Sequence, residues 1–287
     1  MSRWLLLVTA LALGASGCAS PPLAPRSAAP GAPTLSVASY NVEAGRHDDR
    51  SVIEAIGAGD ADVVCLQETT PEFEPVLRSR YGARYPHQRY QHNAPRFGPG
   101  GLAVLSRFPV VDRGHRPSPN RWHPAWHVEI ETPNGPIQIL LVHLRAKMGG
   151  RSNDLAALLT LRGDHLDEIR HFMRWTSPDV PTLVVGDFNE ESDGAAIRWL
   201  EARGFQNALP LFRPGAHTWR YPMLGLEVRQ RLDHILFDRG FLPLDARVLP
   251  RGSSDHLPVV ARFQVATRDP RWAWRGARRD VALRELP

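Results

Sequence analysis

Short apolar, β-branched runs recur along most of this 287-residue chain, and they constrain its fold more than any other feature. Each run is bounded by Gly, Pro, Asn or Asp, a pattern typical of strands separated by turns. The runs cover residues 35–42, 61–66, 101–111, 126–130, 137–144, 182–185, 232–237 and 257–265. They predict a protein built around β-sheet.

The apolar spacing of helices appears between these runs, at 52–56, most clearly at 154–175, and again at 195–203. The turn Thr132-Pro133-Asn134-Gly135 instead joins two runs as a hairpin. This mixture of hairpins and crossover helices predicts one mixed α/β domain over residues 34–267, without an obvious linker. A chain of this length can bury a substantial core.

The N-terminus has the pattern of an export signal. Arg3 precedes an apolar run at 4–13 that is too short to span a bilayer as a mature helix, and small residues then lead to Cys18. This pattern resembles a bacterial lipobox. The resemblance implies a signal peptide at 1–17, lipidation of Cys18, and a place in the cell envelope, on the outer membrane facing the periplasm or the cell surface. Ordinary cleavage near Ala19 would instead give a soluble secreted or periplasmic protein.

Two further segments lie outside the predicted domain. Residues 18–33 are rich in Pro and Ala and predict an extended tether. Residues 268–287 carry six Arg, two Trp and three acidic side chains, and they could bind nucleic acid or an anionic membrane surface, or pack back on the domain. Within the exported body the remaining cysteine, Cys65, lies in an apolar run, which predicts a buried, unreactive thiol.

Net charge says little about partners. The chain carries a formal +5, but one positive charge precedes Cys18 and residues 268–287 contribute three more, so the domain between them is nearly neutral. Arginine supplies the basic excess, since Lys147 is the only lysine. Nucleic-acid binding therefore cannot be inferred from the net charge alone.

Polar motifs stand at the ends of the predicted strands, and their number matters more than any one of them. A single Asp or Asn after a strand usually starts a turn. Together the motifs supply carboxylates, amides and imidazoles, which suit metal-assisted hydrolysis of a phosphate ester. In chain order they are Tyr40-Asn41, Gln67-Glu68, Val142-His143, Gly186-Asp187-Phe188-Asn189, Asp233-His234 and Ser254-Asp255-His256.

The side-chain oxygens of Asn41, Glu68 and Asp255 suit a hard divalent cation such as Mg²⁺. A zinc site is disfavoured, because thiol ligands and an HExxH pair are both missing from the sequence. Histidines can move protons near neutral pH or, when charged, offset charge on phosphoryl oxygens. The motif set therefore predicts a metal-dependent phosphoesterase.

The complete series of motifs, in this order, resembles the endonuclease/exonuclease/phosphatase superfamily, which includes deoxyribonucleases, exonuclease III-like nucleases, sphingomyelinases and inositol-polyphosphate phosphatases. The likeness covers about residues 34–267. It implies an α/β fold, a four-layer sandwich of two packed mixed β-sheets flanked by helices, with the active site at one end of the sheets. It also implies a bound Mg²⁺, with Mn²⁺ as an alternative.

The resemblance assigns a role to each matching residue. Glu68 would be the principal metal ligand, with Asn41 and Asp255 nearby. Asp187 and Asn189 would orient the attacking water and the phosphate.

Two histidines complete the implied catalytic set. His256, paired with a carboxylate, would act as a base or as a phosphate-stabilising acid. His143 would hydrogen-bond a non-bridging oxygen, and Asp233 would support the site from behind.

Other histidines are expected to be structural. His234 is expected to pack behind the site. His87 and His92 are expected in a surface loop, and His165 and His171 are expected to face solvent on the long helix.

Residues near the motifs leave alternatives open. Arg145 and Lys147 could meet phosphate or be solvated loop charges. Trp219-Arg220 and the stretch 121–123 could line the mouth of the site and stack a base or sugar, although packing beneath a loop is the simpler interpretation.

These observations favour an exported nuclease that hydrolyses DNA or RNA as a monomer. The alternative keeps the chemistry but changes the substrate to a phospholipid or a small phosphoester, although no long apolar hairpin is evident in the sequence. A non-catalytic binding protein with the same fold is a third hypothesis, which the intact motif set opposes.

Overall fold

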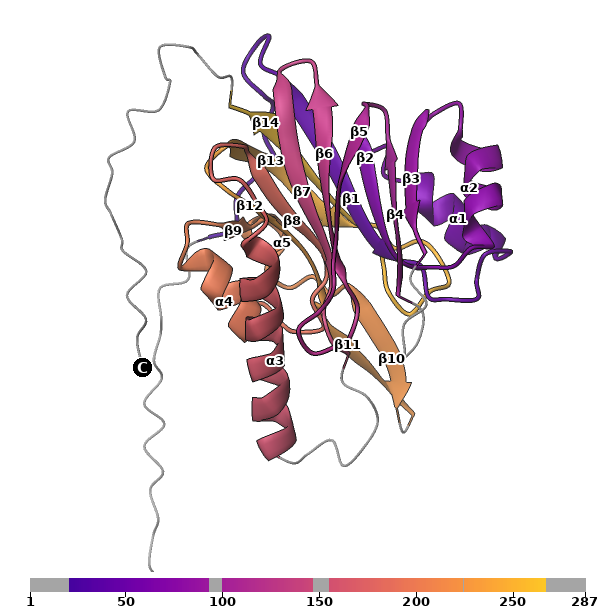
Figure 1. Ribbon diagram of the computed structural model, residues 1–287, viewed down its shortest axis with the longest axis vertical. Coiled ribbons are helices and arrows are strands. Elements are labelled where there is room, and N and C mark those ends of the chain that lie inside the picture. The colour runs from indigo at the N-terminus through magenta and orange to yellow at the C-terminus, as the bar shows by residue number, and fades with distance from the viewer. Residues whose placement is uncertain (1–20, 93–99, 147–154, 224, 267–287) are drawn as a thin grey trace, which may run out of the picture.

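The computed structural model describes residues 21–92, 100–146, 155–223 and 225–266. Within this part of the chain, two six-stranded mixed sheets face each other (Figure 1). The first sheet has the order β13 (Phe241–Val248), β14 (Val259–Val265), β1 (Thr34–Asn41), β2 (Val63–Thr69), β4 (Gly101–Ser106) and β3 (His87–Gln91). The second has the order β5 (Val110–Arg116), β6 (Ala125–Thr132), β7 (Gly135–His143), β8 (Thr182–Asp187), β12 (Asp233–Phe237) and β9 (Gln206–Asn207).

Helices cover the outer faces of the two sheets, which makes four layers. The helices α1 (Arg50–Gly57) and α2 (Phe73–Tyr81) pack on the outer face of the first sheet. The helices α3 (Leu155–Met173) and α4 (Ala195–Glu201) pack on the outer face of the second (Figure 1). The four-layer sandwich expected from the resemblance is therefore confirmed.

Strand alternation builds the core between the sheets. Leu35 and Val37 of β1 point inward, where they join Ile139 of β7 and Leu183 and Val185 of β8 in one buried cluster. The intervening side chains point outward to the helices, because successive residues of a strand face opposite sides. Apolar side chains therefore fill both faces of the central strands, which explains their nearly continuous apolar sequence.

Two parallel strand pairs lie at the centre of the sandwich. β1 pairs with β2, and β7 pairs with β8, while the other strand pairs within the two sheets are antiparallel. Helices α1 and α3 make the crossovers that a parallel pair requires. Each pair consequently ends its two strands at the same edge of its sheet.

The structure corrects one predicted strand and adds elements that the sequence pattern did not reveal. The run at 101–111 is two strands in different sheets, β4 and β5, separated around Pro109, which has no backbone N–H to continue a ladder. His87 lies in strand β3 and not in a loop. The additional elements include α2, α5 (Ala208–Phe212), β9, β13 and the hairpin of β10 (Trp219–Met223) and β11 (Leu226–Gln230).

The N-terminal segment lies along the domain. From residue 21 to residue 33 it forms no helix or strand, as the tether prediction implies. However, the N–H of Leu23 donates to the carbonyl of Leu211, and the N–H of Arg26 donates to that of Leu244. This part is therefore hydrogen bonded to the domain and is not a free tether.

The predicted signal peptide, Cys18 and the basic tail at 268–287 lie outside the described residues. Among the helices that the structure does describe, none is both long and apolar enough to cross a membrane.

Candidate active site

Four of the predicted site residues extend the inward-facing side of the core. Asn41 follows Leu35 and Val37 in the two-residue repeat of β1, and His143 continues the same repeat in β7. Asp187 ends the inward side of β8, and Asp233 begins that of β12. Strand alternation thus aims all four side chains into the space between the sheets, at the end where apolar packing stops.

Glu68 reaches this space through a backbone irregularity. Simple alternation in β2 would send it outward, because Cys65 of the same strand belongs to the core between the sheets. The pairing of β2 with β4 shifts between Gln67 and Thr69, and Glu68 has a left-handed φ of 60°. Asn41 Nδ2 donates to Glu68 Oε1 at 2.9 Å and to Asp187 Oδ2 at 3.1 Å, which links the two sheets.

His256 and Asp233 form a buried pair. His256 Nδ1 lies 2.8 Å from Asp233 Oδ2, and His256 Nε2 lies 3.6 Å from Asp187 Oδ2. Burial lowers the pKa of His256, but the negative charges of Asp233 and Asp187 outweigh it and raise the pKa to about 10. The imidazole is therefore a positively charged donor whose Nε2 faces the site.

Asp187 stands between the two histidines. His143 Nε2 lies 3.7 Å from Asp187 Oδ2 and 3.9 Å from Glu68 Oε1. Burial lowers the pKa of His143, so its ring is neutral near pH 7, and burial raises the pKa of Asp187. The two histidines consequently differ in charge at the same site.

The loop after β8 is fixed by a turn. The N–H of Asn189 donates to Asp187 Oδ1 at 2.9 Å, and Asn189 Nδ2 donates to the carbonyl of Leu144 at 3.0 Å. Asn189 has a φ of 50°, a conformation that Asn tolerates better than most residues. Its amide therefore ties the end of β8 to the end of β7.

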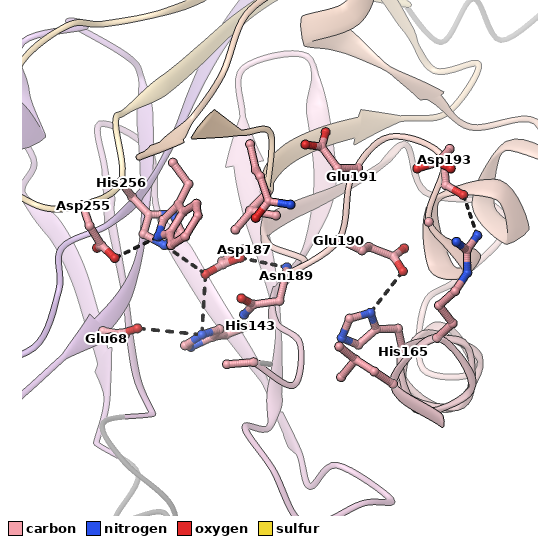
Figure 2. A pocket seen from close by; sticks show the side chains of 17 residues that line it. Glu68, His143, His165, Asp187, Asn189, Glu190, Glu191, Asp193, Asp255 and His256 are labelled. Carbon is pink, nitrogen blue, oxygen red and sulfur yellow. Dashed lines mark hydrogen bonds and ion pairs between the residues drawn. The ribbon is translucent and has the colours of Figure 1, made fainter. Parts of the chain in front are cut away.

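The predicted residues surround one cavity of about 490 Å³ (Figure 2). Asp255 lies beside His256 at one end of it, and its Oδ2 accepts a hydrogen bond from Trp219 Nε1 at 2.8 Å. Asn41 and Asp233 are not among its lining residues and are hydrogen bonded to Asp187 and His256. Those that line the cavity directly are Glu68, His143, Asp187, Asn189, Asp255 and His256.

The donor chemistry of this cavity fits a divalent cation. Glu68, Asp187 and Asp255 present carboxylate oxygens, and within the described residues none of the three forms an ion pair with Arg or Lys. The side chain of Glu68 is 23% exposed, so it is open to the cavity. Carboxylates concentrated without an arginine or lysine partner favour a hard cation that also binds phosphate oxygens.

Asp187, Asp233 and His256 offer a second geometry for a metal. Their ligand atoms lie within 4.8 Å of one another. In this group His256 Nδ1 is already hydrogen bonded to Asp233 Oδ2, so a metal held there would have to replace that bond. The Glu68 side of the cavity could hold a cation without breaking that pair.

The structure corrects the expected position of His165. This histidine is buried and lines the cavity, with Nδ1 3.1 Å from Glu190 Oε2 and Nε2 2.8 Å from the carbonyl oxygen of Arg145. The physical reason is helical spacing, since His165 lies on the same face of α3 as buried Ile169 and Phe172. Glu190 follows the Gly-Asp-Phe-Asn motif directly, and this adjacency was the available sequence signal.

Other expectations have mixed outcomes. His234 is buried as expected, and its two ring nitrogens are hydrogen bonded to Asn207 Nδ2 and to the carbonyl of Glu190. His92 is exposed and follows β3, as the surface-loop prediction implied, and it contacts Glu74. His171 was expected to face solvent but is half-buried. Trp219 does line the cavity.

Arg145 is not a free loop charge, because it pairs with Asp164 and lies over the ring of Trp122. His123 packs against His143, as the packing alternative for 121–123 implied. Lys147 lies outside the described residues.

Two packed mixed sheets with carboxylates and histidines at one edge define a class of phosphoester hydrolases. The sequence matches the model of the Endonuclease/Exonuclease/phosphatase family over residues 38–256. Because the match spans most of the chain, the protein belongs to this family.

Solved structures share the fold at low sequence identity. An endonuclease/exonuclease/phosphatase from Beutenbergia cavernae has a TM-score of 0.65 at 18% identity, covering 81% of this chain and 72% of its own. SmcL has a TM-score of 0.62 at 20% identity, covering 82% and 100%. The human Nocturnin catalytic domain has a TM-score of 0.59 at 19% identity, covering 81% and 94%. None of the curated proteins matches this sequence.

Proposed function

We propose that this protein is a Mg²⁺-dependent phosphodiesterase that cleaves DNA or RNA outside the cytoplasm. The observation that carries the proposal is the buried, hydrogen-bonded His256–Asp233 pair, whose histidine lines the same cavity as Glu68 and Asp187. A cation at Glu68 would supply positive charge to the phosphoryl oxygens and to the attacking oxygen. Family membership supports phosphoester hydrolysis, and the substrate is our inference.

The chain's own residues have separable roles in this reaction. His256, held by Asp233, donates a hydrogen bond to a phosphate oxygen and offsets its growing charge. Neutral His143 donates to a second non-bridging oxygen. Asp187, with a pKa raised by burial, accepts the proton of the attacking water and is kept in place by Asn41 and Asn189.

A substrate panel tests the proposal. The protein lacking residues 1–18 is incubated with duplex DNA, single-stranded DNA, RNA, sphingomyelin and phosphoinositides, with Mg²⁺ or with a chelator. We expect Mg²⁺-dependent cleavage of nucleic acid that stops with the chelator. Glu68→Ala should reduce turnover on the order of a thousandfold, and His256→Ala by about 10²–10⁴-fold. Unchanged activity in either variant would contradict the site assignment.

A phospholipid substrate is the second candidate, because one observation favours it. The hairpin of β10 and β11 projects from the body (Figure 1), and Tyr221 and Leu226 on it are 51% and 75% exposed. Exposed apolar side chains beside a cavity can contact a lipid surface. Lipid hydrolysis without nuclease activity would establish this candidate, and binding without turnover of any phosphoester would favour a non-catalytic role.

We also propose that the chain is exported and lipid-anchored through Cys18, and that it acts as a monomer. The motif before Cys18 supports this location. Metabolic labelling with a fatty acid should mark the wild type but not Cys18→Ser, and fractionation should find the wild type in the membrane. A wild type that carries no label and remains soluble would instead indicate ordinary cleavage.

A further inference from the structure

The two histidines of the site are held in different ways. His256 is oriented by a hydrogen bond from its Nδ1 to Asp233, the usual device for fixing an imidazole ring. His143 has no such bond. Its Nδ1 is buried and has no hydrogen-bond partner among the described residues. Its Nε2 approaches Asp187 and Glu68 only at 3.7 and 3.9 Å, which is too long to fix the ring.

His123 covers one face of the His143 ring. The two ring centroids lie 4.0 Å apart, and the planes are within 8° of parallel. His123 is 4% exposed, and its own Nδ1 has no hydrogen-bond partner in the described part of the chain. Burial lowers the pKa of His123 to about 3, so the covering ring is uncharged. The contact is therefore made by ring faces and not by a polar bond.

His123 is itself held from behind. The ring of Trp122 meets that of His123 edge-on at 6.2 Å, and the guanidinium of Arg145 lies 4.9 Å from the centre of the Trp122 ring. Arg145 pairs with Asp164 of α3. A series of planar groups thus connects the long helix to the face of His143, which gives the stack a rigid support.

We propose that His123 is a positioning residue, which holds the plane of the His143 imidazole by stacking so that Nε2 faces Asp187 and Glu68. This inference deepens the proposed phosphodiesterase function and rests on it for its kinetic consequences. A hydrogen-bond donor must keep its direction to a developing charge, and small misplacements reduce turnover more than they reduce substrate binding.

Three variants test the stack by kinetics on an aryl phosphodiester with Mg²⁺. His123→Ala should lower kcat about tenfold, with KM within about twofold, as for other residues that orient a reacting group. His123→Phe keeps a flat ring but no nitrogen, and it should restore kcat to within about threefold of the wild type. His127→Ala is the matched control, because His127 is another buried histidine, on the opposite face of the sheet from His143, and it should leave kcat unchanged.

Two kinetic outcomes would overturn the inference. A fourth variant, His123→Asn, keeps a polar group without a ring; if it is active and His123→Phe is not, a polar bond and not stacking orients His143. If kcat follows the melting temperature across all variants, His127→Ala included, then His123 contributes only to stability.

A measurement that needs no activity separates this inference from the proposed function. In the NMR spectrum of the histidine Cε1–H groups, the His143 signal is identified by its loss in His143→Gln. We expect one sharp signal in the wild type and in His123→Phe, and a shifted, broadened signal in His123→Ala. If these spectra appear but no phosphodiester is cleaved, the positioning role stands and the proposed function fails. An unchanged His143 signal in His123→Ala would refute the positioning role.

Discussion

Glu68 illustrates how the site uses a single strained residue. A non-glycine residue at a φ of 60° carries a steric cost of about 1–2 kcal/mol. In return, the left-handed turn moves the carboxylate from the helix side of β2 to the cavity. The hydrogen bonds from Asn41 Nδ2 and the N–H of Ala44 hold it there. Function and local stability are therefore opposed at this position.

Replacing Glu68 by glycine should separate the effect of this residue on turnover from its effect on stability. Glu68→Gly removes the steric cost, which about balances the added flexibility of glycine in the unfolded chain. We expect a free energy of unfolding within about 1 kcal/mol of the wild type, together with the loss of turnover expected of Glu68→Ala. Chemical denaturation and steady-state kinetics measure the two effects. Glu68→Gln is the control, since it keeps the strain and removes only the charge; a strongly destabilised Glu68→Gly would contradict this account of the backbone.

At the scale of elements, the close contact of β7 with β8 depends on Gly186. Its φ is 144°, and an added Cβ would overlap the carbonyl oxygen of Val142 on the neighbouring strand. The same strand pair places His143 opposite Asp187. The glycine therefore permits the approach that brings these two site residues together.

Gly186→Ala should consequently disrupt both fold and site. We expect it to be insoluble or to lose several kcal/mol of stability, because both strain and overlap must be relieved. Gly163→Ala is the matched control, since Gly163 lies in α3 with open space around it, and it should stabilise the protein by about 1 kcal/mol. Thermal melting of both variants tests the comparison; a fully stable Gly186→Ala would show that the strands can separate at no cost.

The contact of α3 with the loop after β8 should depend on pH through His165. Burial lowers the pKa of this histidine, but its bond to Glu190 outweighs burial and raises the pKa above the ordinary value. A raised folded-state pKa adds stability that is present below the unfolded value of about 6.5 and is lost as pH rises through the folded value. Glu168 and the carbonyl of Arg145 also face the ring.

We therefore expect the stability difference between the wild type and His165→Gln to be larger at pH 6 than at pH 9. Urea unfolding of both proteins across this range measures it. A difference that grows with pH would show that the pair is not charged in the folded protein.

Sequence pattern predicted elements where apolar spacing was regular. The central strands were predicted because both of their faces are buried; these are β1, β2, β4, β7, β8, β12 and β14. The missed elements have mixed patterns, such as β13 with Pro243 and the half-exposed hairpin of β10 and β11. Edge and surface elements are positioned by tertiary contacts, so their sequences carry a weak periodic signal.

At the scale of the whole molecule, the cavity lining carries a charge of the same sign as the expected substrate. The chain carries a formal +5, yet the cavity is lined by six carboxylates and a single arginine. A phosphodiester is an anion and would be repelled by this lining. A bound divalent cation and the His256 imidazole would offset part of this negative charge where the phosphate binds, which agrees with a metal-dependent reaction.

Mg²⁺ should accordingly stabilise the folded protein. A ligand at about 100 times its Kd adds about 2.7 kcal/mol to the free energy of unfolding. We expect added Mg²⁺ to raise the melting temperature of the wild type and a chelator to reverse it, with little effect on Glu68→Gln. Differential scanning calorimetry measures this without a substrate. An equal shift in Glu68→Gln would place the cation elsewhere.

The sequence by itself determined the mixed α/β class, because apolar periodicity depends only on local spacing. It also identified the polar motifs at the strand ends. Only the tertiary structure decided which of these side chains meet, that Glu68 reaches the cavity through a backbone irregularity, and that His165 is buried. The physical reason is that side-chain direction and burial depend on contacts between residues far apart in the chain. The stacking of His123 on His143, across 20 residues and two strands, is likewise visible only after folding.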